Sequence, residues 1–432
     1  MIRNILLGLA IALPAAPTVA FAQQPAPAAV SQELRRAAES VVNVLRGTAD
    51  LGTVFAPGFL AEVPEAQINQ ISASLAQQNG AVQALDSVQP RSATAGTIRI
   101  RTERAILVMD LGIEPRAPHR IVQLLVTGVE PIGGDSLAAI VDELQALPGQ
   151  VNFTVARLDE SGPVFLAGNN VDQALAIGST FKLIVLGEIS RQVRAGRLRW
   201  DQVVPIERHS LPSGLLQDWP LGSPVTLHTL AGLMISRSDN TATDALIRLA
   251  GRDNVERMMV TMGMRSAARN RPFLTTMEAF QLKAEDAPIV AQWRGADEAA
   301  RRRMLRDRYE QGGVAIDVTR LGVGTPMAIE TVEWFASAAD LVRVIDWLRR
   351  NGDETTHGIL AISPGMPRPA AAPYSYLGFK GGSEAGVINL TWLVRTNAGV
   401  WHAVTGSWNN PAAPIDEGRF IGLVGRALPL VR

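Results

Sequence analysis

The 432-residue chain contains no cysteine and only five histidines. The absence of cysteine excludes disulfide bonds, thiol nucleophiles and cysteine-ligated metal centres, so stability must come from packed cores. The histidines are scattered, and no two stand at the i,i+4 spacing of a helical zinc site: His119, His209, His228, His357 and His402. We therefore expect neither a metal ion nor a cofactor.

The sequence also lacks an excess of charge of either sign. Lys+Arg and Asp+Glu both number 41, which gives a formal net charge of zero. Nucleic acids and anionic membranes attract basic surfaces, so neither is expected as the main partner. The hydrophobic fraction of 47% is enough for two or three packed domains. The composition leaves the oligomeric state open.

Long hydrophobic runs are missing too. Residues 1–22 combine an early arginine, a short apolar run (Ile5–Leu13) and the small-x-small sequence Ala20-Phe21-Ala22. This order is typical of a secretory signal peptide and predicts a periplasmic or secreted protein. The alternative is an uncleaved membrane anchor, which the short run and its interruption by Pro14 and Pro17 disfavour. After signal cleavage no membrane span is expected.

A Pro/Ala/Gln-rich segment, residues 23–31, predicts flexible chain. Residues 32–130 predict a small α+β domain, because helical patterns precede long β-rich stretches. The expected elements are helices over Glu33–Arg46 and Pro64–Asn79 and antiparallel strands over Thr97–Ile113 and Arg120–Val129.

Residues 134–432 predict a second, larger α+β domain, with one antiparallel sheet formed by both of its ends. Asp135 or Ser136 can cap a helix that runs to Leu147. Helical segments fill the middle, and a further helix can close the chain. The expected strands are Asn152–Leu158, Pro163–Ala167, Tyr376–Lys380, Gly386–Arg395 and Val400–Ser407, and the closing helix is Arg419–Leu430.

A serine and a lysine stand three positions apart at the start of an apolar helical run, GSTFKLIVLGEI. Ser179 is expected near the helix amino terminus, where free N–H groups favour a developing oxyanion. Lys182 shares its face of the helix. Burial would disfavour the ammonium form, and a neutral amine can accept the serine proton. Alone, the pair also fits an N-cap serine with a lysine that reaches solvent.

Two further motifs follow at a distance. Ser238-Asp239-Asn240 comes after an apolar helix, and a serine there can pass a proton to a leaving nitrogen. Lys380, Gly382 and Ser383 come from KGGS at a strand end, where the lysine supplies positive charge and the Ser383 N–H can join that of Ser179 as an oxyanion hole. Each alone also fits a solvated turn or a hairpin tip.

From about Ser136 to Leu430 the chain resembles the class A β-lactamase and penicillin-binding family, through its S-x-x-K, S-D-N and K-T-G motifs. The resemblance implies an all-helical lobe beside an α/β lobe, with the site at their junction. It implies Ser179 as acylated nucleophile, Lys182 as its proton partner and Ser238 as proton shuttle. Asn240 would bind the substrate amide. Lys380 and Ser383 would form the carboxylate and oxyanion side.

The chain departs from this family in two ways. Gly381 replaces the K-T-G threonine, and Ser383 is expected to compensate for the lost hydroxyl. The E-x-x-L-N loop, whose glutamate activates the deacylating water in the lactamases, has no equivalent between Asn240 and Lys380. Glu278 is the nearest carboxylate for that task; the alternative is a surface helix residue. The Arg-rich stretch DEAARRRMLRDRYEQ predicts a solvated helical face.

The order of domains is similar to that of the two-domain serine hydrolases encoded in clavulanic acid gene clusters. That resemblance implies a steroid-isomerase-like fold for residues 32–130. The sequence therefore predicts an exported serine hydrolase that acts on a small β-lactam-like, ester or amide substrate. The alternative is a non-catalytic or slowly turning-over protein that binds penicillin or cell-wall ligands.

Overall fold

The fold is described by a computed structural model for residues 30–133, 135–310, 324–366 and 368–431. The predicted signal peptide, residues 1–22, lies outside these ranges, as does most of residues 23–31. Within them, every helix is too short or too polar to span a bilayer.

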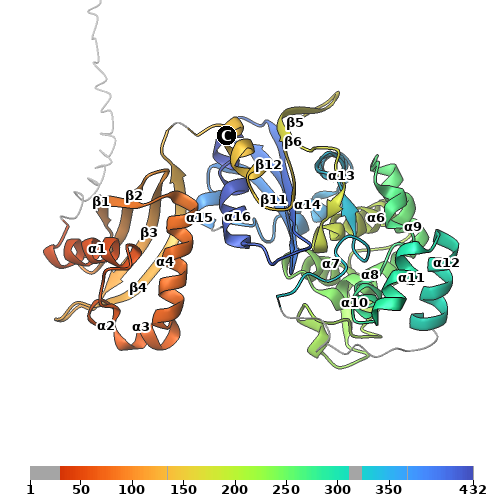
Figure 1. Cartoon of the computed structure of the whole chain (residues 1–432), viewed down its shortest axis with the longest axis horizontal. Helices are drawn as coiled ribbons and strands as arrows, with labels where there is room; N and C mark the ends of the chain where they lie inside the picture. The colour runs from red at the N-terminus through yellow and green to blue at the C-terminus, as the bar shows by residue number, and fades with distance from the viewer. Residues whose placement is uncertain (1–29, 134, 311–323, 367, 432) are drawn as a thin grey trace, which may run out of the picture.

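The amino-terminal part of the chain forms one antiparallel sheet with helices against it (Figure 1). The helices are α1 (Gln32–Leu45), α2 (Leu51–Val54), α3 (Pro57–Glu62) and α4 (Glu65–Asn79). The strands, in spatial order, are β1 (Val82–Pro90), β2 (Ala95–Thr102), β3 (Ala105–Ile113) and β4 (Ile121–Pro131). Alternate residues of β2 and β3 are buried against α1, and Leu34, Val41, Ile98 and Leu107 are completely buried in the resulting core.

Two predicted helices here are confirmed, but the strand prediction was wrong in number. The expected strand Thr97–Ile113 is two strands, separated at Glu103-Arg104. The hydroxyl of Thr102 donates to the carbonyl oxygen of Asn79 and accepts a bond from the N–H of Ala105, which fixes this turn. Strand β1 was not predicted, because neither of its faces is consistently buried and its sequence lacks a clear alternation.

The larger sheet has five strands in the order β11-β12-β13-β5-β6, and all neighbours are antiparallel. Strands β5 (Gln150–Asp159) and β6 (Gly162–Asn169) come early in the chain. The other three, β11 (Tyr374–Glu384), β12 (Val387–Thr396) and β13 (Trp401–Asn409), come late. The predicted sheet made from both ends of the segment is confirmed.

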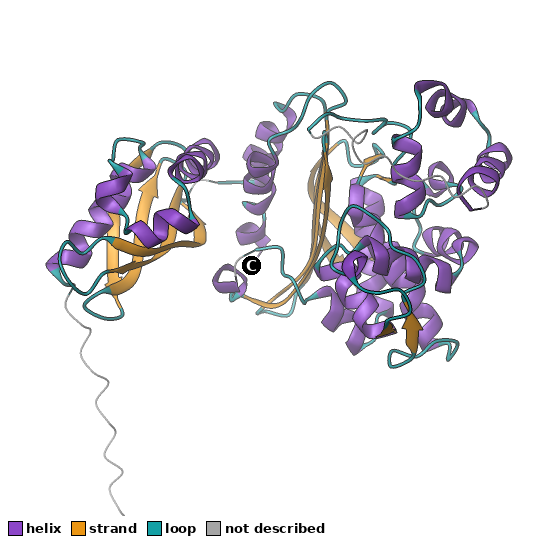
Figure 2. Ribbon diagram, turned by 90° about the horizontal axis from the view of Figure 1, so that it is seen from below, coloured by secondary structure: helices purple, strands orange, loops and turns teal. Residues whose placement is uncertain are grey.

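Helices cover both faces of this sheet (Figure 2). On one face α5 (Leu137–Gln145), α16 (Glu417–Gly425) and a 3₁₀ turn (Leu428–Val431) pack on Phe153, Trp392 and Val404. On the other face α13 (Ala338–Asn351) packs on Ala156, Leu393 and Ala403. Neighbouring residues such as Trp392 and Leu393 thus enter opposite cores, as the two-residue period of a strand requires.

The segment between β6 and β11 forms the helical lobe. Its helices are α6 (Lys182–Arg194), α7 (Leu227–Ser236), α8 (Asn240–Ala250), α9 (Arg252–Thr261), α10 (Thr276–Lys283), α11 (Ala287–Gly295), α12 (Glu298–Met304), α13, α14 (Glu354–Leu360) and α15 (Arg368–Ala371). Its short strands are β7 (Leu175–Ala176) paired with β10 (Phe335–Ala336), and β8 (Val203–Pro205) paired with β9 (Pro224–Thr226). An α+β fold with a helical lobe was predicted and is confirmed.

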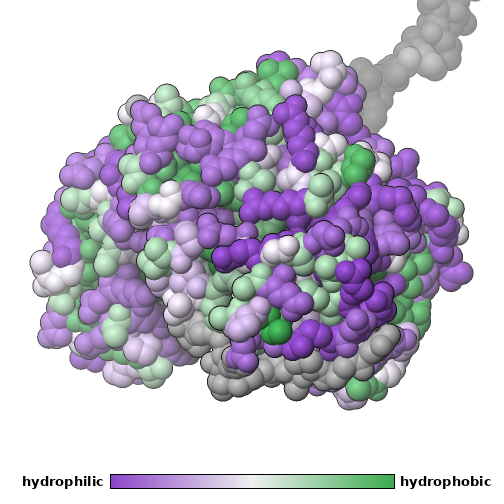
Figure 3. Space-filling view, turned by 45° about the vertical axis from the view of Figure 1, so that its right-hand side comes forward, coloured by the Kyte–Doolittle hydropathy of each residue, from purple (hydrophilic) through white to green (hydrophobic). Residues whose placement is uncertain are grey.

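The Arg-rich stretch has the solvated helical face that was expected, with Glu298, Arg303 and Arg306 exposed, but its other face is buried. Met304, Leu305 and Tyr309 are buried in the helical core. Arg302 pairs with Glu256 across helices and with Glu298 on its own helix. Elsewhere, on the face shown in Figure 3, hydrophilic and hydrophobic residues are interspersed.

Candidate active site

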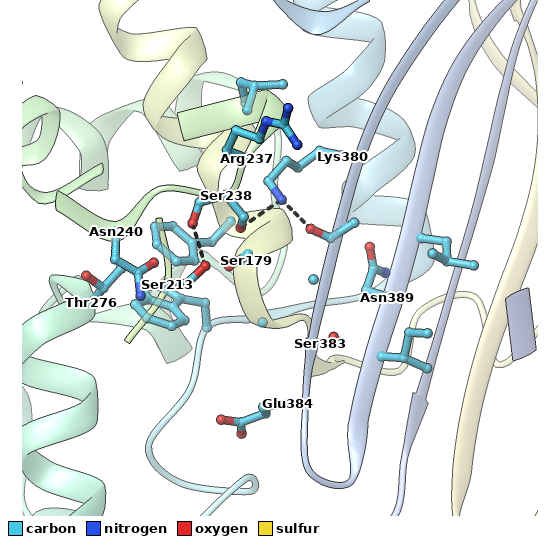
Figure 4. Close-up of a pocket in the computed structure, with 18 of the residues that line it drawn as sticks. Ser179, Ser213, Arg237, Ser238, Asn240, Thr276, Lys380, Ser383, Glu384 and Asn389 are labelled. Carbon is cyan, nitrogen blue, oxygen red and sulfur yellow. Dashed lines mark hydrogen bonds between the residues drawn. The ribbon is translucent and has the colours of Figure 1, made fainter. Parts of the chain in front are cut away.

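A cavity of about 710 Å³ opens between strand β11 and the helical lobe. Every predicted site residue except Lys182 is part of its wall, and Lys182 is hydrogen-bonded to two wall residues, Ser238 and Asn240. The predicted residues in the wall are Ser179, Ser238, Asn240, Lys380, Gly382 and Ser383. Figure 4 shows Ser179, Ser238, Asn240, Lys380 and Ser383 around the same space. Residues far apart in sequence therefore share one cleft.

Ser179 lies in a 3₁₀ turn, η1 (Gly178–Phe181), that leads directly into α6. Packing of Phe181 stabilises the turn, because its ring stacks on Trp334 with a centroid distance of 3.8 Å. The side chain of Ser179 is partly exposed at the cavity. The predicted position at a helix amino terminus is confirmed.

Two glycines allow η1 to approach β11 closely. A Cβ atom at Gly382 would lie 2.3 Å from the carbonyl oxygen of Ile177 and 2.4 Å from the backbone nitrogen of Ser179. Gly178 has a φ of +47°, and a Cβ there would lie 3.2 Å from the nitrogen of Ser383. The backbones thus meet at the two N–H groups predicted to form an oxyanion hole. Only glycine fits at this crossing.

The ammonium group of Lys182 is completely buried and has three acceptors. Nζ donates to the carbonyl oxygen of Ser238 at 2.6 Å, to its Oγ at 3.1 Å and to Oδ1 of Asn240 at 2.8 Å. Burial lowers the pKa of Lys182 well below its usual value, and the charge of Lys380 lowers this pKa further. The apolar run predicted a buried amine with a depressed pKa at Lys182, and the complete burial of this side chain agrees with that prediction.

The hydroxyl of Ser238 lies between two lysines. Its Oγ is 3.1 Å from Nζ of Lys182 and 3.1 Å from Nζ of Lys380. Ser238 has a φ of +54°, which is uncommon outside glycine and is often found at functional sites. Asp239 fixes this conformation: its carboxylate caps α8 at Ala242 and accepts bonds from the backbone of Leu215 and Leu216.

Asn240 is buried at the start of α8, and its side chain contacts both the lysine and a loop. Oδ1 accepts the bond from Lys182, and Nδ2 donates to the carbonyl oxygen of Leu211 at 3.4 Å. That second bond is long, so the amide nitrogen is the part of Asn240 best able to turn toward a ligand in the cavity.

Lys380 lies inside strand β11, because the strand continues to Glu384 and does not end at Lys380 as predicted. The side chain is almost completely buried, and burial lowers the pKa of Lys380 to about 7. The site therefore holds two lysines, near one hydroxyl, whose positive charges are both disfavoured.

The predicted compensation for the missing threonine hydroxyl is weakened by two neighbours. At Gly381 a Cβ would lie 2.8 Å from Cζ of Phe379, so an aromatic ring occupies the space of a side chain. Glu417, at the start of α16, lies beside the side chain of Ser383. A carboxylate beside Ser383 repels an anionic group at this position.

The structure contradicts both interpretations of Glu278. It is neither exposed nor part of the cavity wall. Its carboxylate pairs bidentately with Arg252, at 2.6 and 2.9 Å, and closes a capping box with Thr275 at the start of α10. Glu278 is a structural residue outside the cavity wall, so the prediction that it is the water-activating base was wrong.

A buried acidic cluster in the cavity wall was missed by the sequence analysis. Glu384 follows Ser383 in β11, and Glu333 precedes Trp334 near β10. Both contact the ammonium of Lys283, at the end of α10; for Glu333 the distance from Oε1 to Nζ is 2.6 Å. Three elements supply the three residues, so spacing could not reveal the cluster. In the described ranges, acidic residues and histidines form no group suited to a metal ion.

The comparisons with known proteins agree with the predicted resemblance. Residues 135–301 match the model of a family described as the β-lactamase enzyme family. Among curated proteins there is no match. Similar solved structures include a β-lactamase from Sphaerobacter thermophilus (23% identity, TM-score 0.49, covering 68% of this chain and 96% of that one).

Two further structures are similar at lower identity. One is PBP-A L158E in an acyl-enzyme complex with penicillin G (15% identity, TM-score 0.46, covering 68% and 96%). The other is the putative class A β-lactamase PenP from Rhodopseudomonas palustris (15% identity, TM-score 0.47, covering 69% and 100%).

Proposed function

We propose that this β-lactamase-like protein is a serine hydrolase that forms an acyl-enzyme at Ser179 on β-lactams or related esters and amides. The observation that carries the proposal is the position of the Ser238 hydroxyl, 3.1 Å from both Lys182 Nζ and Lys380 Nζ in the cavity that Ser179 lines. A structural role alone does not require two desolvated amines around one hydroxyl.

In this proposal the proton transfers run through Lys182, which stands three residues after Ser179 and is hydrogen-bonded to Ser238. Neutral Lys182 takes the proton of Ser179 as Oγ attacks the carbonyl carbon. The N–H groups of Ser179 and Ser383 stabilise the resulting oxyanion. Lys182 then returns a proton through Ser238, which donates its own proton to the leaving nitrogen or oxygen while the bond to carbon breaks. Lys380 holds the Ser238 oxygen in place for this exchange.

The part of the cavity beside Ser383 favours substrates without a carboxylate, whereas Arg237 and Lys380 are the basic residues elsewhere in its wall. Gly381 offers no hydroxyl, Phe379 fills the adjacent space, and Glu417 places negative charge beside Ser383. We therefore place neutral esters or amides ahead of anionic penicillins as substrates. The same features support the second candidate, a protein that binds such ligands and turns them over slowly or not at all.

Intact mass spectrometry after mixing with a fluorophosphonate, an activated ester or a β-lactam tests the proposal. We expect a mass increase that Ser179→Ala abolishes and that Lys182→Met slows. An adduct that persists would favour the slow binder, and full hydrolysis by Ser179→Ala would refute the acyl-enzyme. We also propose export directed by residues 1–22, for which amino-terminal sequencing of the mature protein is the direct test.

A further inference from the structure

The proposed acyl-enzyme needs a base to activate the water that releases the acyl group, and Glu278 is not available for this task. The only acidic side chains in the described part of the cavity wall are Glu333, Glu384 and Glu417. Glu417 lies at the largely solvent-exposed start of α16. The other two belong to the cluster with Lys283.

The cluster of Lys283, Glu333 and Glu384 is largely buried, and burial favours the protonation state without net charge. The side chains of Lys283 and Glu333 are 3% and 2% exposed, whereas that of Glu384 is 20% exposed and borders the cavity. Glu333 and Glu384 both contact the one ammonium group of Lys283, so one of the two carboxyl groups must hold a proton if the buried group is to be neutral. With Lys283 charged, this arrangement has no net charge, the state that a buried site favours.

Glu384 is also on the correct side of the strand. Lys380, Gly382 and Glu384 alternate along β11, so they share the face that meets η1. At Gly382 that face touches the nitrogen of Ser179, and two further residues of strand advance about 7 Å. Glu384 and Ser179 line the same cavity, in which a water molecule could lie between them. In Figure 4, Lys380 and Ser238 lie on one side of Ser179 and Glu384 on the other.

We propose that Glu333 and Glu384 form a single-proton dyad that activates the deacylating water, with Glu384 as the catalytic residue in contact with that water and Lys283 as a positioning residue. The inference rests on the proposed acyl-enzyme at Ser179.

In the release step the water oxygen attacks the acyl carbonyl carbon. Its proton passes to the free oxygen of Glu384, while the proton that Glu384 already holds moves to Glu333. The bond between carbon and Ser179 Oγ then breaks, and Oγ takes up a proton that enters from solvent through Lys182, which is neutral after acylation. The dyad releases its extra proton to solvent, so the number of protons is unchanged over the step. The step needs no further reactant, and two carboxyl groups with one proton can carry it out at neutral pH.

The charged groups that face Glu384 are Lys283 of α10 and Glu333. Burial first, and then the negative charge of Glu333, raises the pKa of Glu384 well above its usual value, while Lys283 lowers it. Removal of Glu333 should therefore lower the pKa of Glu384. If Glu333 and Glu384 had only a structural role, this change in the pKa of Glu384 would leave the pH dependence of deacylation unchanged.

The test measures acylation and release separately, by rapid-quench intact mass spectrometry with an activated ester on the full-length protein. Glu384→Gln should acylate at the wild-type rate and release the acyl group roughly 10²–10⁴-fold more slowly. Glu333→Gln should also release more slowly, and the acidic limb of its release profile should move to lower pH. Glu278→Gln is the matched control, because it alters a buried, ion-paired glutamate of α10 outside the cavity; it should lower thermal stability without slowing release.

The outcomes separate the two proposals. If the wild-type protein forms no adduct at Ser179, the acyl-enzyme itself is refuted. If the adduct forms and folded Glu384→Gln releases it at the wild-type rate, the dyad is refuted and the acyl-enzyme stands. If Glu384→Gln does not fold, the wild-type and Glu333→Gln pH profiles decide: identical acidic limbs would exclude the dyad.

Discussion

Replacement of Gly382 by alanine should disable Ser179 while leaving the sheet intact. The added Cβ would lie 2.3 Å from the Ile177 oxygen, 2.4 Å from the Ser179 nitrogen and 2.7 Å from the Thr180 nitrogen. All three are backbone atoms, so no side chain can turn away. Non-bonded atoms prefer separations of about 3.5 Å or more, so η1 and β11 must move apart by about 1 Å.

A displacement of that size separates the two N–H groups of the predicted oxyanion hole. A misplacement of about 1 Å costs roughly 10²-fold in rate. We expect Gly382→Ala to react with a fluorophosphonate roughly 10²-fold more slowly than wild type. The readout is the rate of the mass increase at Ser179, measured beside the melting temperature.

The matched control is Gly358→Ala in helix α14, where no heavy atom lies within 4 Å of the added methyl group. That variant should react at the wild-type rate and gain up to about 1 kcal/mol in stability, because alanine favours helices over glycine. If folded Gly382→Ala reacted as fast as Gly358→Ala, the close approach of η1 and β11 would have no part in the chemistry.

Three further perturbations test the site from other directions. Burial lowers the pKa of Lys380 from 10.5 to about 7, so burying this lysine destabilises the fold fully below pH 7 and not at all above pH 10.5. The stability of Lys380→Met relative to wild type, measured by urea unfolding, should therefore rise between pH 10 and pH 7. An equal difference at both pH values would contradict the depressed pKa. Asp239→Ala leaves the N–H groups of Leu215, Leu216 and Ala242 without their carboxylate and should cost about 3–5 kcal/mol in the same assay, whereas Asp239→Asn should cost less. Gly381→Thr should not lower KM for anionic substrates, because Phe379 occupies the space of the new side chain. The double variant Gly381→Thr with Phe379→Ala should lower that KM in steady-state kinetics. If the single variant already lowered KM as much as the double variant, the Phe379 ring would be irrelevant.

The three motifs were predictable because each carries a strong local signal. Ser179 and Lys182 stand one helical turn apart at the start of an apolar helix, and Ser238 follows another. Lys380 lies in a strand with β-rich neighbours, although the polar and glycine residues after it hid the strand's continuation to Glu384. The order of strands from both ends of the larger segment was also readable, since each strand is bounded by turns.

What could not be predicted depends on contacts between distant elements. Glu278 was interpreted from its helical surroundings, but its partner Arg252 belongs to the preceding helix α9. The Lys283–Glu333–Glu384 cluster needs α10, the chain before β10 and the end of β11 to meet. No periodicity in a single segment contains that information.

The strand order of the larger sheet has a consequence for biosynthesis. Strand β13 separates β5 from β12, so the early strands lack their neighbour until residue 409 has been made. At ordinary ribosomal speeds, the interval between the end of β6 and the end of β13 is roughly 12–50 s. Until residue 384 has been made, Ser179 lacks both Lys380 and the backbone of β11. The site around Ser179 is therefore completed late in synthesis. A polypeptide truncated before β11 would lack Lys380 and Ser383 and would be unable to form the acyl-enzyme.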